Sequence, residues 1–497
     1  MPFKKSCIRG EGSSTKNKII KSVNFPDEVV ENIFSYLPVK LAERIGARAE
    51  RFRCSWKLSH YLDFDKDFAE GMTQKEYVNT VVWIMMFHKG TKVRRFRLYS
   101  DASLDHDLFQ DWLDIIDEKG VEEVDLDFSP GKKERFVFYS HLIDSEKTIK
   151  ILKLTHCKVN FPPTHEFTSW SNLTSITLRR VLLDGDLNEI VNANCFLLEK
   201  LILIQCRGIE MLKILCSGHK WFKMLKVVSC FTIHEIIIDV PTLTTFHYRG
   251  YAHDVDISID SASKLQDVVL YFISRRTLPS ILDLDEMDLN HVETLTVSSY
   301  FIEALKQQPI IIPYVKEVQI LMEKTSNCNL YDIANFLISC PLLERVFIDI
   351  NGFFFNDGPY WMHHDAKRFL EFSGWFTHLK SVKVIGFKYS HLDILLARLF
   401  LEKSPQLRNM VLTTAKSRSE KVEMKDIEYP NHASVCDTEQ YSPHALKVGD
   451  ITPLIVLQYA TPSNTLNTLY GRLSNSMFKI VSGSKALFNT NQSIHSN

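Results

Sequence analysis

One apolar pattern recurs along the middle of this chain at a nearly constant interval. It reads apolar-x-x-apolar-x-apolar-x-x-Cys, and successive copies end at Cys157, Val181, Cys206 and Cys230, which are 24, 25 and 24 residues apart. Unrelated apolar clusters would not keep this spacing. Each copy predicts a short strand with alternating inward apolar residues, then a return segment that places the next strand alongside.

Looser copies extend the array in both directions. They begin at Val93, Val121, Leu243, Leu265, Val292, Val315, Leu343, Leu379 and Leu407. Repeats of this kind are leucine-rich repeats, so the sequence predicts an α/β solenoid with a curved parallel sheet and helical or irregular return segments over residues 66–412. The spacing after Tyr248 is less regular, which predicts longer loops or helices there. A cysteine at the ninth position is expected to have a structural role, because the chain turns inward there and backbone groups need partners.

Composition narrows the environment and the partners. The ten cysteines include no C-x-x-C pair, and we expect reduced thiols in the cytoplasm or the nucleus. The most apolar short run, Val81 to Phe87, is far shorter than a membrane-spanning helix. Lys and Arg number 59 against 60 Asp and Glu, so no strong field of one sign predicts a nucleic-acid or membrane partner.

The two ends of the chain differ from the repeats. Residues 1–23 have few apolar side chains and predict a disordered leader. Residues 24–65 predict a helical module, with a turn at residues 62–65, because an apolar face runs along the first helix between two prolines. Residues 413–497 predict a weakly structured tail rich in Ser, Thr and Asn, in which the strip from Thr452 to Tyr459 could add a strand or dock on the array.

Two segments resemble known sequence families. Residues 25–65, which begin Phe-Pro-Asp-Glu-Val-Val-Glu-Asn-Ile-Phe-Ser-Tyr-Leu-Pro, resemble an F-box. Residues 378–412, which begin His-Leu-Lys-Ser-Val-Lys-Val-Ile-Gly-Phe, are similar to the FBD segment that closes many plant F-box/leucine-rich-repeat proteins. Three residues depart from the F-box pattern: Phe25 replaces a leucine, and Ala49-Glu50 replace a serine followed by a basic residue.

This resemblance implies a substrate-recognition adaptor of a Skp-cullin-F-box ubiquitin ligase. The F-box would bind a Skp-type adaptor protein, and through it a cullin-RING ligase, while the repeats would bind an unknown protein substrate. The docking surface carried over by position consists of Pro26, Val29, Val30, Ile33, Leu37 and Pro38, with Trp56 closing the module. The alternative is a leucine-rich-repeat scaffold without a ligase, in which residues 24–64 only cap the solenoid and bury these side chains in their own chain.

Motifs for catalysis or cofactor binding are missing from the sequence. There is no phosphate-binding glycine loop and no G-x-S-x-G elbow, and His363 and His364 lack the spacing of helical metal ligands. The acidic pairs at Glu122-Glu123 and at Asp283 with Asp285 are typical of solvated loop and strand edges. We therefore expect no enzymatic activity, no cofactor and no metal in this chain.

The residues between the inward apolar positions predict the binding face of the solenoid. This predicted row consists of Lys153, Thr177, Ile202, Lys226, His247, Val269, Thr296, Gln319 and Phe347. Ile202, Val269 and Phe347 are apolar where solvent is expected, which is typical of an interaction site unless inserted loops cover them. A small-molecule receptor is a third possibility, but it would need a convergent basic cluster that the sequence does not show.

Overall fold

The structure of the protein is a computed structural model. This structure describes residues 26–48, 52, 54–130, 134–142, 148–161, 170–215, 219–251, 255–273, 287–305, 310–356, 358, 361–414, 454–458 and 480–481. The chain forms two compact units, the first made of residues 1–267 and 283–289 and the second of residues 268–282 and 290–497. The predicted leader, most of the predicted tail, Phe25, Ala49-Glu50 and the acidic pair at 283 and 285 lie outside the described residues.

The first unit begins with the helical module. Helices α2 (Asp27–Ser35) and α3 (Val39–Gly46) each follow a proline, which has the fixed backbone angle that suits a helix start. Both helices pack against the short 3-10 helix η2 (Ser55–Leu58). The expected turn at residues 62–65 is mostly strand β1 (Tyr61–Phe64), which pairs with the next strand of the solenoid. Its inward Leu62 and Phe64 explain this, because they repeat the apolar alternation of the later copies.

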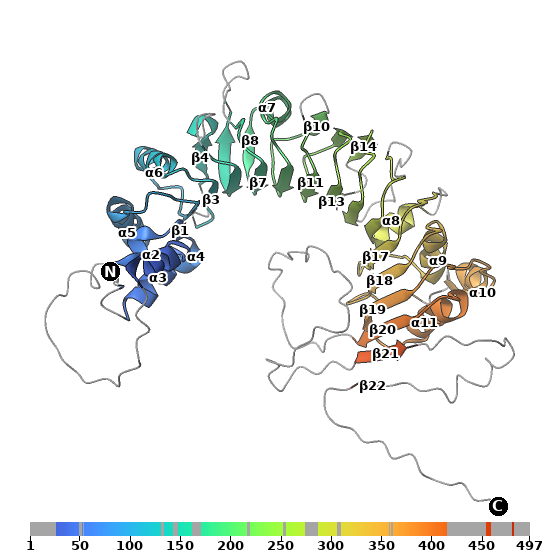
Figure 1. Cartoon of the computed structure of the whole chain (residues 1–497). Coiled ribbons are helices and arrows are strands. Elements are labelled where there is room, and N and C mark those ends of the chain that lie inside the picture. Colours follow the sequence, from blue (N-terminus) through green and yellow to red (C-terminus); the bar gives the residue numbers. More distant parts are fainter. Residues whose placement is uncertain are drawn as a thin grey trace, which may run out of the picture. The chain divides into compact units, whose positions relative to one another are not determined.

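A parallel sheet runs through the first unit, as the repeat predicts. Its strands are β1, β2 (Arg95–Tyr99), β3 (Glu123–Asp127), β5 (Ile151–Thr155), β7 (Ser175–Arg179), β9 (Lys200–Ile204), β11 (Met224–Val228) and β13 (Thr245–Tyr251). In Figure 1 they lie side by side along an arc. Equivalent repeat residues pair in register, as in Leu152 with Ile176 and Ile176 with Leu201, and their side chains are fully buried. The predicted solenoid fold is thereby confirmed.

The return segments of the first unit form an outer layer behind this sheet (Figure 1). Some are helical: α4 (Lys66–Ala69), α5 (Gln74–Phe87), α6 (His106–Glu118), α7 (Leu187–Asn194) and the 3-10 helix η3 (Ser140–Leu142). Others are strands of two small parallel sheets, β4 (Phe136–Tyr139), β6 (Cys157–Asn160) and β8 (Leu182–Asp184), and β10 (Met211–Leu215), β12 (Glu235–Asp239) and β14 (Asp256–Asp260). The repeat pattern predicted helical or irregular return segments, so these strands were not predicted.

The inward turn after each strand explains the regular spacing of the cysteines. The residue before the ninth position has a left-handed backbone, with φ near +55° at His156, Arg180, Gln205 and Ser229. The next residue then points into the core, and the Cys206 thiol donates a hydrogen bond to the Leu178 carbonyl over 3.2 Å. The buried thiol thus contacts the backbone of the preceding repeat, as expected for a structural cysteine.

The turn at Gly208 offers a sharp test of this packing. Gly208 has φ +86°, and a Cβ atom there would lie 2.1 Å from the Leu183 carbonyl oxygen. We expect Gly208→Ala to lower the free energy of unfolding by at least about 2 kcal/mol, because a left-handed backbone and a backbone clash both oppose the methyl group. Gly120→Ala is the matched control, since Gly120 has φ +65° with no atom within 4 Å of that position. Urea denaturation would measure the free energy of unfolding of both variants. Equal losses of stability in the two would contradict the prediction.

The second unit contains the later parallel strands. Its strands are β15 (Asp267–Ile273, whose first residue belongs to the first unit), β16 (Thr294–Ser298), β17 (Glu317–Leu321), β18 (Arg345–Asp349), β19 (Ser381–Phe387) and β20 (Asn409–Thr414). Helices lie between them: α8 (Ser299–Ala304), α9 (Leu330–Ile338), the π-helix η7 (Trp361–Asp365), α10 (Ala366–Leu370) and α11 (His391–Lys403). These helices account for the wider repeat spacing after Tyr248.

The FBD-like segment is one complete repeat of the second unit. Residues 378–412 contain β19, α11 and most of β20, with Leu396 and Phe400 of the helix fully buried. The apolar strip from Thr452 to Tyr459 contains strand β21 (Leu454–Gln458), which pairs antiparallel with β20, and β22 (Ile480–Val481) pairs with β21. No helix within the described ranges is long and apolar enough to cross a membrane.

Candidate partner-binding surfaces

Helix α2 has two apolar faces, and within the described part of the chain only one of them is buried. Val30 and Phe34 are buried against the rest of the module. Val29 and Ile33, four residues apart on the other face, are 41% and 48% exposed. Pro26 is exposed beside them, and Leu37 and Pro38 are half-buried at the end of the helix. The helix therefore presents Pro26, Val29 and Ile33 to solvent, while Val30 contributes to the core.

Trp56 holds this module together from within. Its side chain is fully buried, and its ring lies 5.2 Å from that of Trp83 on α5. The Ser59 hydroxyl donates to the Leu37 carbonyl over 2.5 Å, and the His60 backbone N–H donates to the Ser35 carbonyl over 2.8 Å. Trp56 therefore fixes the module from inside and has no surface of its own to offer a partner.

The sequence analysis did not include Tyr36 in the docking surface. Tyr36 is 51% exposed at the end of α2, and the Arg94 guanidinium lies 5.6 Å from the centre of its ring. Ile45 on α3 is 38% exposed. Amphipathic spacing within one helix could not predict these two residues, since their exposure depends on how α2 and α3 pack together.

The exposed face of the first unit's sheet brings together the predicted row. Lys153 pairs in register with Thr177, Thr177 with Ile202, Ile202 with Lys226, and Lys226 with His247. Each of these side chains is half-buried, as expected for neighbours on a pleated face. The same row continues into the earlier repeats through Asp125, Arg97 and Asp63, which the sequence analysis did not include.

The strands of the second unit carry the rest of the predicted row. Thr296, Gln319 and Phe347 pair in register, and Val269 lies on β15. Gln319, Phe347 and Val269 are half-buried, but Thr296 is only 8% exposed and presents almost no surface. The row extends to Lys383, whose ammonium group lies 5.7 Å from the centre of the Phe347 ring.

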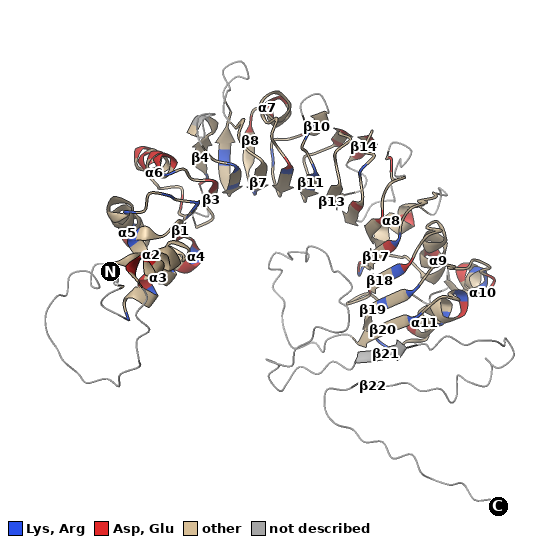
Figure 2. Cartoon of the chain, viewed as in Figure 1, with Lys and Arg blue, Asp and Glu red and all other residues tan. Residues whose placement is uncertain are grey.

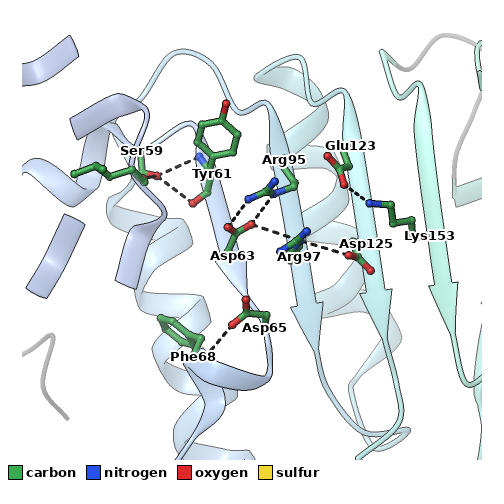
Figure 3. A network of polar contacts seen from close by, with 11 residues as sticks. Ser59, Tyr61, Asp63, Asp65, Phe68, Arg95, Arg97, Glu123, Asp125 and Lys153 are labelled. Carbon is green, nitrogen blue, oxygen red and sulfur yellow. Dashed lines mark hydrogen bonds and ion pairs between the residues drawn. The ribbon is translucent and has the colours of Figure 1, made fainter. Parts of the chain in front are cut away.

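Ion pairs cover the face of the first repeats (Figure 3). Arg95 donates two hydrogen bonds to the Asp63 carboxylate, from Nε over 2.9 Å and from Nη2 over 2.7 Å. Arg97 Nε lies 3.4 Å from an Asp125 oxygen and 3.9 Å from Asp63. Lys153 Nζ lies 2.6 Å from Glu123 Oε1. The charges on this part of the face therefore largely neutralise one another.

The environment of these groups changes their pKa values. The hydrogen bonds and the charge of Asp63 raise the pKa of the Arg95 guanidinium, which therefore remains charged. Burial raises the pKa of the Asp125 carboxyl, and the nearby Lys153 and Arg97 oppose that shift. The network is thus a fixed structural element of the first repeats.

The described residues give little indication of a metal site or a reactive nucleophile. They include no group of three or more His, Cys, Asp or Glu residues that could hold a metal ion. Burial raises the pKa of the Cys195 and Cys340 thiols to about 12, so at neutral pH they are protonated and poorly nucleophilic. Glu122 is within ion-pair distance of Lys92 and Lys150, which fits a solvated strand edge.

The parallel strands are joined by return segments, and their inward apolar residues stack into one core. This arrangement defines a leucine-rich-repeat protein. The chain belongs to the family of the At1g61320/AtMIF1 leucine-rich-repeat domain, whose model matches residues 84–440.

The relatives of this chain are plant proteins. It is 29% identical over 439 residues to the FBD-associated F-box protein At1g61320 of Arabidopsis thaliana, covering 84% of this chain and 94% of the relative. It is also 29% identical over 435 residues to At1g61330 of the same plant, whose name also describes an FBD-associated F-box protein, covering 84% and 96%. The F-box/LRR-repeat protein At3g03360 is 22% identical over 355 residues, covering 66% and 70%. The chain thus resembles, over most of its length, plant proteins whose names describe an F-box.

Proposed function

We propose that this chain is a substrate-recognition adaptor subunit of a Skp-cullin-F-box ubiquitin ligase. Its F-box would bind a Skp-type adaptor protein, and its repeats would bind a target protein. The proposed role needs no catalytic residue in this chain, because ubiquitin transfer would be carried out by the partner subunits. The family's F-box names support this proposal.

One observation carries the proposal: the outer face of α2 is apolar and exposed. Val29 and Ile33 are 41% and 48% exposed, although burying an aliphatic side chain fully stabilises by about 1.5–3 kcal/mol. A module that served only as a cap would be more stable with these side chains turned inward, as Val30 and Phe34 are. An exposed pair on one helix face fits a helix that docks on a second protein.

The double variant Val29→Asp, Ile33→Asp tests this docking. Two carboxylates would replace the apolar contact, and an interface cannot bury them without partners. We expect the affinity for a plant Skp-type adaptor to fall at least about tenfold, which corresponds to a loss of about 1.4 kcal/mol. Titration calorimetry or a pull-down with purified proteins would measure this loss.

The control for this test is Phe196→Asp, which replaces another exposed apolar side chain of the first unit. Phe196 is 50% exposed and lies just after α7, far along the chain from the helical module. We expect it to leave adaptor binding unchanged. Circular dichroism and urea denaturation must show the same stability for all variants. Absence of adaptor binding by the unmodified chain would reject the proposal and favour the scaffold in which residues 24–64 form a cap.

A further inference from the structure

A groove lies along one edge of the first unit's sheet, where its strands begin. It is open, has a volume of about 560 Å³, and extends from Lys92, before β2, to Leu197, before β9. Each repeat from β2 to β9 lines the groove with residues that shortly precede its strand. Figure 2 shows that the strands beginning at this edge carry both basic and acidic residues. Four steps between neighbouring strands make the groove about 19 Å long, which is enough for an extended ligand.

Two lysines at one end of the groove share a single carboxylate. Lys92 Nζ lies 3.7 Å and Lys150 Nζ lies 3.9 Å from the same oxygen of Glu122, Oε1. Both distances exceed the length of a hydrogen bond. One carboxylate therefore offsets one of the two positive charges and leaves both ammonium groups able to donate to another acceptor.

Lys119 adds a third positive charge at the same end. Its ammonium group donates to the Gly90 carbonyl over 2.8 Å, and the Val93 backbone N–H donates to the Lys119 carbonyl over 3.0 Å. A carbonyl uses one of the three N–H groups and does not neutralise the charge. Burial lowers the pKa of the Lys119 ammonium, and the charge of Glu118 opposes that shift. Among the described lining residues, three ammonium groups against one carboxylate leave a net charge of +2.

The rest of the groove is neutral and ends in an apolar side chain. The Thr148 and Thr174 hydroxyls donate to backbone carbonyls of the preceding repeat, over 2.8 and 3.2 Å, so they shape the wall. Leu197 is 44% exposed, and Phe196 beside it is 50% exposed. Leu197 lies two strands beyond Lys150, which is about 10 Å at the usual strand separation. The groove thus has a cationic end and an apolar end.

We propose that this groove binds a phosphate monoester, with the phosphate at the end lined by Lys92, Lys119 and Lys150 and an apolar group of the same ligand against Leu197. A phosphate monoester carries a charge of about -1.5 to -2 at pH 7, which matches the net charge of the lining, whereas one carboxylate would offset only half of it. Its oxygens accept hydrogen bonds, which suits a lining whose donors are ammonium groups. The groove shares no residue with α2, so the inference does not depend on the proposed adaptor function.

Two sources share this chemistry, a phosphorylated side chain of a protein and a free small molecule, and each has its own probes. The first is a phosphoserine peptide with leucine three residues later, because an extended chain rises about 3.3 Å per residue and so places the two side chains about 10 Å apart. Its comparison peptides carry aspartate in place of phosphoserine, or serine in place of leucine. The second is biphenyl-4-yl phosphate, compared with biphenyl-4-yl sulfate, which has the same shape and one negative charge.

Titration calorimetry with the full-length protein measures these affinities. We expect the phosphorylated probe of at least one series to bind at least about tenfold tighter than each of its comparison compounds. Selectivity in the peptide series alone would assign a protein as the source, and selectivity in the biphenyl series alone would assign a small molecule. Absence of selectivity for phosphate in both series would overturn the proposal.

Opposite changes of charge in the lining locate the site. Lys92→Gln, Lys150→Gln removes two ammonium groups, and we expect it to weaken binding of the selected phosphorylated probe at least about tenfold. Glu122→Gln removes the competing carboxylate, and we expect it to strengthen binding about threefold or more, because the groove then carries one more net positive charge. Unchanged binding in the double variant, or weaker binding in Glu122→Gln, would overturn the proposed location.

Lys223→Gln is the matched control for these variants. Lys223 directly precedes β11 as Lys150 directly precedes β5, but it pairs with its own carboxylate, that of Glu199, over 2.9 Å and does not line the groove. We expect this variant to bind the probe like the unmodified chain. Circular dichroism and urea denaturation must show the same stability for all variants, and a loss in Lys223→Gln equal to that of the double variant would reject the groove as the site.

Discussion

Replacing Trp56 by alanine is expected to lower the stability of the helical module by about 3–5 kcal/mol, the usual cost of removing a large buried aromatic side chain. Trp56 has no exposed surface and packs 5.2 Å from Trp83, with α2 and α3 on η2 around it. The cavity left by the indole could close only if both helices moved. The Ala variant should therefore lose the packing that orients Val29 and Ile33.

The loss should be concentrated near the module, because each repeat of a solenoid contacts mainly its neighbours. Hydrogen exchange would show this as faster exchange in α2 and β1 than in β9. Trp221→Ala is the control, since Trp221 is 56% exposed and its removal should cost less than about 1 kcal/mol. Comparable losses in the two variants, or equal acceleration along the whole solenoid, would show that Trp56 does not hold the module as described.

The repeat made most of the fold predictable from sequence. Inward apolar residues such as Leu152, Ile176 and Leu201 fix which face of each strand is buried, and a shift of one residue would expose all of them. The predicted outward row was therefore correctly aligned from Lys153 to His247. Its binding role remains a prediction, since alignment on a face does not show a partner.

The strands of the outer layer were missed because their sequences alternate poorly. In β12, buried Ile236 and Ile238 are separated by half-buried Ile237, so the burial has the period of a strand while the sequence shows one continuous apolar run. The pattern is only a few residues long, and nothing within one repeat shows that it pairs with the equivalent segments of the repeats before and after. β1 was missed for a different reason, since Leu62 and Phe64 lie at the end of the F-box-like segment and were assigned to its closing turn.

The ion pairs of the first repeats also depend on the stacking of the strands. Asp63 and Arg95 are 32 residues apart, and only the register of β1 with β2 brings them within 2.7 Å. The sequence alone therefore could not show that the charges of the first repeats neutralise one another.

Acidification from pH 7.5 to 5.0 is expected to cost the first unit about 2 kcal/mol through His88 alone. Its side chain is 7% exposed at the end of α5, and Nε2 lies 2.8 Å from the Ser59 carbonyl, which requires Nε2 to carry the proton. Nδ1 has no hydrogen-bond partner among the described residues. Burial therefore lowers the pKa of His88 from 6.5 to about 4. A second proton would place a buried charge at Nδ1.

The sign of this effect follows from which state binds the proton first. Below pH 6.5 the unfolded chain binds a proton at His88 while the folded chain does not. The free energy of unfolding therefore decreases as the pH is lowered, until the folded side chain is also protonated near pH 4. The full difference is about 3 kcal/mol. Burial also lowers the pKa of His60 and His219, which adds to the loss, whereas the raised pKa of the Glu43 carboxyl acts in the opposite direction.

The variant His88→Gln isolates this contribution, because its amide can still donate to the Ser59 carbonyl and does not titrate. Urea denaturation at pH 7.5 and 5.0 should show a smaller loss in the variant than in the unmodified chain, by about 2 kcal/mol. His88 follows α5, and its bond to Ser59 holds the segment that leads into β1. Hydrogen exchange should therefore locate the difference in α5 and β1. If the pH dependence of the variant equals that of the unmodified chain, His88 accepts its second proton without cost, and the contact between α5 and the helical module is more open to water than its burial indicates.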